Sequence, residues 1–543
     1  MQNINRYTNK INQNKIIRIE SITIILLLIV FSSIISLAQH TFQTKIGGSF
    51  TEVGNSIIQT TDSAYVIAGK TSSYGAGIDE AYIIKIDREG DTIWTKTFGG
   101  IERDEAFSIQ QTSDNGFIIS GSSASFNDVA GDLYLIKLDA AGDTTWTKTY
   151  GGNGMEWGVS VKQTFDGGYI VAGQTPAFGS GGWDVYLIKI NSNGSIFWTK
   201  TYGESGGDFG YSVVQTADSG YAITGSTSSF GAGSDDIYLI KTDAAGIHQW
   251  SKTYGGTGEE TGYTIYQTAD GGYIIGGETN GYGMGVDDLF LLKTSASGVK
   301  QWMKTYGGTL SDGYGSMTLT SDGGYTLCGN SRSFSGAGDF DAYLIKTDST
   351  GAILFTKTYG TPGNEYANGM DITYDGGYIL TGSTTSNNAP FEEVYIVKTD
   401  VSGNSGCSQF STNTIALDAF VNAATTLTLT ANGGTSFSPA TQTGAGGTTS
   451  TLCFASAVNE FNNELAVKLY PNPFHENATL HISEFNNGVC LTIYNLMGKE
   501  VKKQFILNSS TLINRSGLPD GFYSYQISDE RKEILRAGKF IVN

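Results

Sequence analysis

The chain has 543 residues, 73 of them Gly, and a formal net charge of −19 at pH 7. This length exceeds that of one ordinary hydrophobic core, so the chain holds several domains or a repeat array. Abundant Gly, Thr, Ser and Tyr with few helix formers predict an all-β protein of short strands and tight turns. The negative charge argues against nucleic acid or anionic lipid as a partner, because both require clustered Lys and Arg.

The N-terminus has the pattern of a secretory signal peptide. Basic residues precede an apolar run at 22–35, and the small residue Ala38 ends the segment. The run falls short of the ~20 residues that span a bilayer, so we predict a signal peptide over residues 1–38. An uncleaved anchor helix is the alternative. No second apolar segment of this kind follows, and we expect no transmembrane segment after signal cleavage.

A unit of about 52 residues recurs seven times between residues 41 and 400, which indicates a repeat architecture. Its aromatic landmark opens the motif Trp-Thr-Lys-Thr-Tyr-Gly-Gly, and a turn Asp, a Gly and a Lys keep the same step. The aromatic positions are Phe42, Trp94, Trp146, Trp198, Trp250, Trp302 and Phe355. The turn Asp positions are Asp62, Asp114, Asp166, Asp218, Asp270, Asp322 and Asp375. The Lys positions are Lys85, Lys137, Lys189, Lys241, Lys293, Lys346 and Lys398.

Each unit contains four strand-like runs of about five residues with Gly, Asp or Asn turns between them, a pattern typical of a four-stranded antiparallel sheet. Seven such sheets around an axis leave only short edges. We therefore predict a seven-bladed β-propeller over residues 39–400, with a linear β-solenoid as the alternative. The array begins with a lone strand at 41–46 and ends at 394–398 without its counterpart. We expect the N-terminal strand to complete the last blade.

Two resemblances support this fold. The pattern Tyr-Leu-Ile-Lys-x-Asp-x-x-Gly followed by Trp resembles the outer strands of quinoprotein-like propellers. The whole unit resembles the repeats of uncharacterised exported propellers. Neither resemblance implies an activity, because propellers include both enzymes and binding modules.

Residues repeated in all seven units are most simply explained by the scaffold. The turn Asp residues suit tight hairpins, the Gly residues mark expected close approaches to a neighbouring blade, and the aromatic series supplies packing area.

Two acidic series are less ordinary, because both fall on one end of the predicted ring. Three roles are open for them: hydrogen bonding between blades, calcium binding, or attraction of a cationic ligand. The sequence lacks an Asp-x-Asp-x-Asp-Gly loop, which weakens the calcium case, and we expect no other cofactor. The candidate cation ring is Glu52, Asp104, Glu156, Asp208, Glu260, Asp312 and Glu365. The second series is Glu80, Asp132, Asp184, Asp236, Asp288, Asp341 and Glu393.

A specific site should lie where the units differ. Aromatic residues among the acidic positions suggest carbohydrate or cation binding; the alternative is that each ring packs on its own turn. The candidate ligand-binding residues are Trp157, Trp183, Phe209, Tyr282 and Phe340.

No catalytic residue is assigned. The four histidines, His40, His248, His475 and His481, cannot supply a Ser/His/Asp or Cys/His set within one domain. A hydrolase or lyase that uses only carboxylates is the remaining enzymatic alternative, because glycoside cleavage needs two carboxyl groups.

Residues 401–460 are rich in Thr, Ser, Ala, Asn and Gly, and we interpret them as a linker of weak β character. Cys407 and Cys453 bracket this region. Export to an oxidising space favours a disulfide between them. Cys328 lies in a predicted strand and is expected to be a buried thiol.

Residues 461–543 return to alternating apolar patterning, which predicts a small β-sandwich. The Tyr-Pro-Asn-Pro-Phe opening, the Ile-Tyr-Asn-Leu-x-Gly-Lys-Glu-Val core and the Gly-Lys-x-Ile-Val ending resemble the type A sorting domain of the type IX secretion system. The resemblance implies recognition by this machinery and a protein that is released or held at the outer cell surface.

Taken together, the sequence predicts an exported, monomeric propeller that binds an extracellular protein or a glycan. A carboxylate-dependent enzyme acting on polysaccharides and a structural adhesion scaffold are the alternatives.

Overall fold

The computed structural model describes residues 40–126, 130–335, 340–386, 390–419, 422–425, 429–431, 435–437, 442–444, 448–456, 467–470, 474–482, 489–495, 499–528 and 534–542. The predicted signal peptide lies outside these residues. All named elements within them are β-strands, and none of the described residues forms a helix with the length and apolarity needed to span a bilayer. The chain divides into two compact units, residues 1–457 and 458–543.

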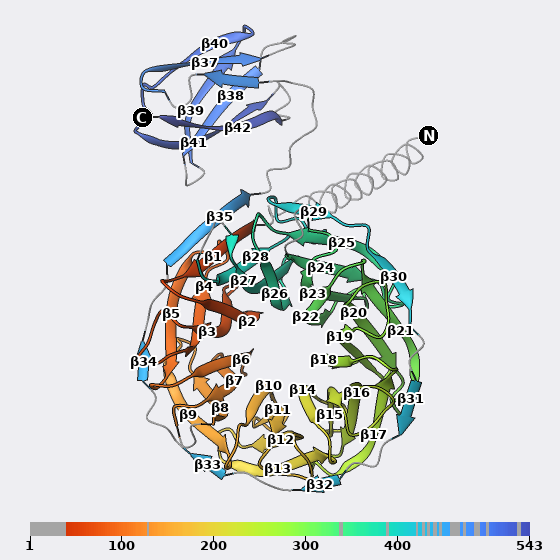
Figure 1. The fold of residues 1–543 in the computed structure, drawn as a ribbon. Coiled ribbons are helices and arrows are strands. Elements are labelled where there is room, and N and C mark those ends of the chain that lie inside the picture. Colours follow the sequence, from red (N-terminus) through yellow and green to blue (C-terminus); the bar gives the residue numbers. More distant parts are fainter. Residues whose placement is uncertain are drawn as a thin grey trace, which may run out of the picture. The chain divides into compact units, whose positions relative to one another are not determined.

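In the first unit, the described residues form seven five-stranded antiparallel sheets. Figure 1 shows them arranged in succession around a central opening, so the fold is all-β and propeller-like. We number them in chain order. Sheets 1 to 6 begin with β2, β6, β10, β14, β18 and β22, and sheet 7 has the order β26-β27-β28-β1-β35.

The first strands lie nearest the opening in Figure 1. These are β2 (Glu52–Gln59), β6 (Asp104–Gln111), β10 (Trp157–Gln163), β14 (Asp208–Gln215), β18 (Glu260–Gln267), β22 (Asp312–Leu319) and β26 (Glu365–Ile372). The second strands are β3 (Tyr65–Thr71), β7 (Phe117–Ser123), β11 (Tyr169–Thr175), β15 (Tyr221–Thr227), β19 (Tyr273–Thr279), β23 (Tyr325–Ser331) and β27 (Tyr378–Thr384).

The third strands are β4 (Glu80–Ile86), β8 (Asp132–Leu138), β12 (Asp184–Ile190), β16 (Asp236–Thr242), β20 (Asp288–Thr294), β24 (Asp341–Thr347) and β28 (Glu393–Lys398). The fourth strands are β5 (Thr92–Gly99), β9 (Thr144–Gly151), β13 (Ile196–Gly203), β17 (His248–Gly255), β21 (Lys300–Gly307), β25 (Ile353–Tyr359) and, from the N-terminus, β1 (His40–Gly47).

The core lies between successive sheets. Every residue of β12 is buried, which explains its near-continuous apolar sequence, because both of its faces are covered. One apolar cluster joins Leu133 and Leu135 of sheet 2 to Val171 and Ile188 of sheet 3. Packing of each sheet on the next therefore provides the apolar stabilisation of the array.

The predicted pairing of the N-terminal strand with the last unit is present. Strand β1 pairs antiparallel with β28, with Phe42 opposite Lys398 and Ile46 opposite Val394. The fourth strand of sheet 7 thus comes from the opposite end of the repeat array, which ties the first unit to the last.

Much of the region interpreted as a linker forms strands that pair with the seven sheets. Seven strands from it add a fifth strand to the outer edge of each sheet, in reverse chain order (Figure 1). We call them the belt: β29 (Gln409–Ser411), β30 (Ile415–Asp418), β31 (Asn422–Thr425), β32 (Leu429–Ala431), β33 (Thr435–Phe437), β34 (Gln442–Gly444) and β35 (Thr448–Ser456). The belt covers edges that the four-stranded units leave unpaired.

The cysteines fit the prediction where they are described. Cys407 is disulfide-bonded, and Cys328 is a buried free thiol, as is Cys490. The side chain of Cys453 is not among those described, so its bond to Cys407 stays a prediction. Its backbone lies opposite Gln43, and the Gln43 amide donates a hydrogen bond to the Cys407 carbonyl oxygen.

Two scaffold series have roles that the sequence did not reveal. Each series Lys forms an ion pair with the turn Asp of its own unit, as Lys189 does with Asp166 at 3.0 Å. The series Gly lies against a carbonyl of its own sheet, not of the next: a Cβ atom on Gly173 would be 1.6 Å from the Trp157 oxygen. Register shifts at this place, such as that after Gly158, mark a bulge in each first strand.

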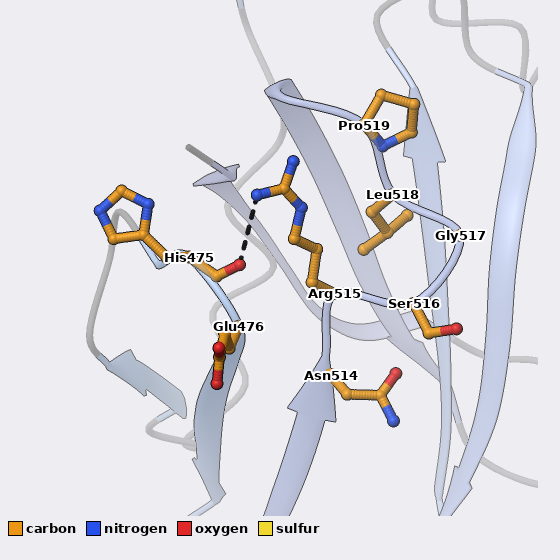
Figure 2. A pocket seen from close by; sticks show the side chains of 8 residues that line it. All are labelled: His475, Glu476, Asn514, Arg515, Ser516, Gly517, Leu518 and Pro519. Carbon is orange, nitrogen blue, oxygen red and sulfur yellow. Dashed lines mark hydrogen bonds between the residues drawn. The ribbon is translucent and has the colours of Figure 1, made fainter.

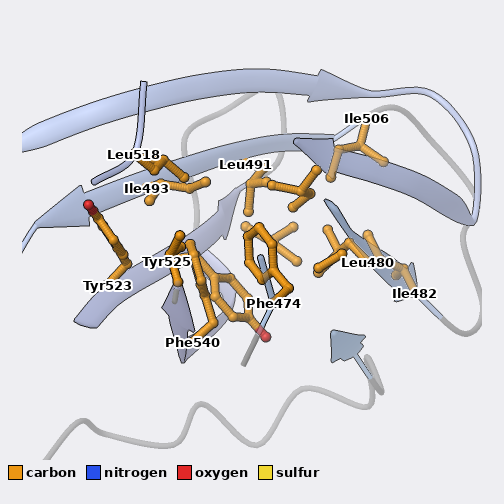
Figure 3. Close-up of a cluster of buried hydrophobic side chains, with 14 of the residues drawn as sticks. Phe474, Leu480, Ile482, Leu491, Ile493, Ile506, Leu518, Tyr523, Tyr525 and Phe540 are labelled. Atoms are coloured by element: carbon orange, nitrogen blue, oxygen red, sulfur yellow. The ribbon is translucent and has the colours of Figure 1, made fainter. Parts of the chain in front are cut away.

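The second unit contains a three-stranded sheet, β36-β37-β40, and a four-stranded sheet, β39-β38-β41-β42, in its described residues. Both sheets contribute to one apolar cluster, in which Phe474 and Phe540 stack with ring centroids 5.6 Å apart (Figure 3). The strands are β36 (Val467–Tyr470), β37 (Asn477–Ile482), β38 (Val489–Asn495), β39 (Glu500–Ile506), β40 (Ser510–Asn514), β41 (Gly521–Ser528) and β42 (Ile534–Val542).

Candidate functional site

The candidate cation ring is built into the scaffold. All seven carboxylates are 0% exposed, and each accepts a hydrogen bond from the backbone N–H four residues earlier. In six of them a Thr or Ser 19 residues later also donates, as Thr71 does to Glu52 at 2.8 Å. Asp104 accepts from Ser125. These contacts hold the start of each first strand to the second strand of the same sheet.

The second acidic series meets this ring between sheets. A Cβ atom on Gly203 would lie 2.4 Å from Asp184 Oδ1 and 2.5 Å from Asp208 Oδ2. Because glycine lacks that atom, the carboxyl groups of neighbouring sheets approach each other across it. The same arrangement recurs in the pairs Glu80/Asp104, Asp132/Glu156, Asp236/Glu260, Asp288/Asp312 and Asp341/Glu365. We call these the carboxyl pairs.

The carboxyl pairs favour bound protons. Burial, with the charge of the partner carboxylate adding to it, raises the pKa of Glu80 and of Glu156 to about 7. The same causes raise the pKa of Asp184 and of Asp288 to about 6. No group of three or more His, Cys, Asp or Glu side chains suited to a metal ion occurs in the described part of the chain. The calcium role of the ring therefore stays a prediction that the geometry does not support.

The side chains that differ between units lie further along the first strands and surround the axis. A cavity of about 370 Å³ is lined by residues from all seven first strands. Three residues after each ring carboxylate, the lining residues are Asn55, Phe107, Val159, Tyr211, Tyr263, Gly315 and Asn368. We call this space the axial cavity.

A second cavity of about 530 Å³ shares Phe107, Val159 and Tyr211 with the axial cavity and lies at the ring-carboxylate end of these strands. We call it the mouth. Trp157 and Met155 add apolar surface there.

Four of the five charged side chains of the mouth occur in pairs of opposite sign, and the fifth is the buried ring carboxylate Asp104. Lys70 Nζ lies 3.7 Å from Glu105 Oε2, and Arg103 Nε lies 3.6 Å from Asp79 Oδ2. Both cationic side chains of the mouth are therefore close to carboxylates, and the whole chain has a formal charge of −19.

A continuous series of half-buried aromatic rings follows the mouth and one side of the axial cavity. Successive ring centroids are 5.0 to 6.4 Å apart. We call this series the aromatic arc: Phe107, Trp157, Trp183, Phe209, Tyr211, Tyr263 and Tyr314.

The structure brings together three of the five predicted ligand-binding residues, Trp157, Trp183 and Phe209. Tyr282 instead packs against the apolar cluster between sheets 4 and 5, and Phe340 contacts Tyr366 with centroids 5.5 Å apart. Both therefore lie outside the arc.

The sequence analysis missed four members of the arc: Phe107, Tyr211, Tyr263 and Tyr314. Three of them occupy the third position after a ring carboxylate, and the fourth, Tyr314, occupies the second. Comparison of the units would have identified them. The second position is Gly or Ala in the other six units, and the third position varies while the fourth is Ser or Thr in six units.

The second unit has an open cavity of about 570 Å³. It lies beside Arg515, which donates a hydrogen bond to the His475 carbonyl oxygen at 3.4 Å (Figure 2). Arg515 also forms an ion pair with Asp520. Its lining belongs to the region with the sorting-domain resemblance.

Comparison with known proteins identifies this second unit. Residues 468–543 match the family described as the secretion system C-terminal sorting domain, which confirms the predicted tail. The chain is thus cargo of the type IX secretion system, and the protein is secreted or lies at the cell surface.

The chain also has more distant relatives. The regulatory protein FlaEY of Caulobacter vibrioides is 26% identical over an alignment of 265 residues, which covers 44% of this chain and 27% of that protein. The chain therefore spans about a quarter of this curated relative.

Solved structures show lower similarity. A fungal alcohol oxidase of the AA5 family, in complex with copper, is 12% identical, with 94% of this chain and all of that chain covered and a TM-score of 0.40. The extracellular domain of a putative hybrid two-component system from B. thetaiotaomicron is 9% identical, with 94% and 59% covered and a TM-score of 0.37. PorZ, a surface component of the type IX secretion system of Porphyromonas gingivalis, is 9% identical, with 92% and 100% covered and a TM-score of 0.16.

Proposed function

We propose that the seven sheets are the blades of a closed propeller, that the second unit is a β-sandwich, and that the exported protein binds an extracellular ligand in the mouth. The aromatic arc is the observation that carries the binding role. At the third position after the ring carboxylate, Phe107, Tyr211 and Tyr263 are half-buried rings, whereas the other four units hold Asn, Val or Gly there. Aromatic surface that is not needed by the repeated scaffold is typical of a binding site.

Site-specific cross-linking tests this role. A photoreactive amino acid replaces Met155, which lines the mouth and is 37% exposed. The matched control carries it at Phe165, which is 73% exposed in the turn between β10 and β11. The full chain, incubated with extracellular material from its own cells and habitat, is expected to cross-link a ligand at position 155 and not at 165. Equal or absent cross-linking at both positions would refute a binding mouth.

A carboxylate-dependent hydrolase is a second candidate, favoured by one observation beside the arc. Burial and the nearby Asp287 raise the pKa of Glu278, and Glu278 accepts a hydrogen bond from the Tyr314 N–H at 3.0 Å. A protonated carboxyl group near an ionised one is what glycoside cleavage requires. Release of reducing ends from a polysaccharide, lost in Glu278→Gln, would support hydrolysis; no release by the parent protein would exclude it for that substrate.

A further inference from the structure

We infer that the ligand of the mouth is a neutral, linear glycan whose end enters the axial cavity. This inference rests on the binding role proposed above and names the chemical class of ligand. It follows from how apolar, polar and charged groups are distributed around the axis.

The axis has two chemically different walls. The aromatic arc occupies the side formed by sheets 2 to 6, whereas sheets 7 and 1 present the amides of Asn368 and Asn55. Asn55 donates to the Ala106 carbonyl oxygen at 2.9 Å and Asn368 donates to that of Gly54 at 3.1 Å. These hydrogen bonds fix the orientation of both Asn side chains, and with it the position of each side-chain oxygen.

A pyranose ring is suited to a site with one aromatic wall and one polar wall. Its C–H face is apolar and stacks on aromatic rings, while its rim of hydroxyl groups requires donors and acceptors. Hydroxyl side chains one residue beyond the varying position add to the polar lining: Ser56, Ser108, Ser160, Ser212, Thr264 and Ser316. A ligand with one apolar face and a polar edge fits this lining better than a purely apolar one.

The length of the arc favours a chain over a single sugar. Its rings succeed one another at 5.0 to 6.4 Å, so a flat ring of pyranose size contacts one or two of them at a time. Contact along the whole arc therefore requires several linked sugars.

The charges favour a neutral chain. In the mouth, Lys70 and Arg103 are each close to a carboxylate of opposite sign, so neither is left to bind an anionic glycan. The third carboxylate of the lining, Asp104, already accepts hydrogen bonds from the Gly100 N–H and the Ser125 hydroxyl. The net charge of −19 also disfavours the approach of a polyanionic glycan.

Charged donors and acceptors remain at the far end of the axial cavity. Six residues after their ring carboxylates, Lys162 projects from β10 and Asp371 from β26 into this lining. Burial lowers the pKa of Lys162, and the opposite charge of Asp371 partly offsets this effect. Asp371 accepts the Gln59 N–H at 2.9 Å. These groups would bind hydroxyls of a terminal sugar by charge-assisted hydrogen bonds.

Calorimetric titration of the full chain tests the inference. The probes are hexamers of β-1,4-glucose, α-1,4-glucose, β-1,4-mannose and β-1,4-N-acetylglucosamine, with hexagalacturonate as the acidic comparison. At least one neutral hexamer is expected to bind, and hexagalacturonate is expected to bind at least tenfold more weakly. The inference is wrong if no neutral hexamer binds or if the acidic one binds as well.

Variants locate the site. Trp157→Ala and Phe209→Ala are each expected to weaken binding of the neutral hexamer at least tenfold, whereas the exposed control Phe165→Ala leaves it unchanged. Two separate arc variants guard against misfolding of one, and thermal unfolding checks both. Lys162→Met is expected to weaken binding at least fivefold; unchanged affinity would overturn entry of the chain end into the axial cavity.

The two proposals fail differently. Cross-linking at position 155 to a non-glycan ligand, without binding of neutral hexamers, would overturn the ligand class and leave the binding role intact. Absence of both signals would overturn both.

Discussion

The carboxyl pairs predict that the propeller-like unit is more stable at pH 5 than at pH 8. Between about 4 and 7, the folded chain keeps protons on Glu80, Glu156, Asp184 and Asp288, because their pKa values are about 6 to 7. The same groups are ionised in the unfolded chain. The folded state therefore binds more protons, and the free energy of unfolding falls as pH rises through this window.

The magnitude follows from the shifts. For Asp184, a change from 3.8 to about 6 corresponds to about 3 kcal/mol as an upper limit, at 1.36 kcal/mol per unit. Relaxation of the protein around a newly ionised group, which gives even buried sites an effective dielectric constant of about 20, reduces this to about 1 kcal/mol for each group. The four groups together then lower the free energy of unfolding by about 4 kcal/mol between pH 4 and 8.

Denaturant unfolding at several pH values measures this slope. Asp184→Asn keeps an oxygen for the N–H groups of Ser180 and Gly181 but cannot ionise, so it should reduce the slope by the share of one group. Asp91→Asn, in an exposed turn, is the control and should leave the slope unchanged. Stability that is constant or rises from pH 5 to 8 would refute the reasoning.

Further tests address the scaffold. Tyr202→Phe removes the hydrogen bond to the Gly246 carbonyl oxygen at 2.7 Å and should cost about 1–2 kcal/mol in denaturant unfolding; no loss would show that this bond between sheets is dispensable. Asp166→Asn should cost about 1 kcal/mol, since Asp166 is exposed and solvent screens its pair with Lys189; a cost above about 3 kcal/mol would contradict that screening. Cys407→Ser and Cys453→Ser should each lower stability by about 3 kcal/mol, and unequal losses would argue against their pairing. A chelator should leave the thermal midpoint unchanged, because the ring carboxylates accept protein hydrogen bonds; a lower midpoint would restore the calcium role.

The sequence predicted the repeated strands better than the contacts between particular side chains. The step of about 52 residues predicted the strand order within each unit, and the missing partner for residues 394–398 predicted the role of β1. It did not show that Lys189 reaches Asp166, because a contact across 23 residues depends on how the hairpins stack. The close approach of Asp184 to Asp208 was hidden for the same reason, since it depends on a glycine of the intervening strand.

The candidate site was predicted only in part, because binding residues were expected in loops and not within strands. Trp157, Trp183 and Phe209 were found as aromatics near acidic positions. Tyr211 and Tyr263 were passed over because they lie inside strands that looked like scaffold. In a ring of sheets, however, the first strand faces the axis, and its inward positions vary without loss of the packing between sheets.

The side-chain pattern of the belt does not predict that its strands pair with the sheets. Its strands are short, three to nine residues each, and they join the sheets through main-chain hydrogen bonds along an outer edge. Such pairing requires no alternation of apolar and polar residues, because a residue at the edge needs no buried face. Thr, Ser and Gly are therefore sufficient, and the same composition suits an unpaired spacer. What distinguishes the two is the presence of seven open edges in the repeats that precede it, a property of the folded array and not of the segment itself.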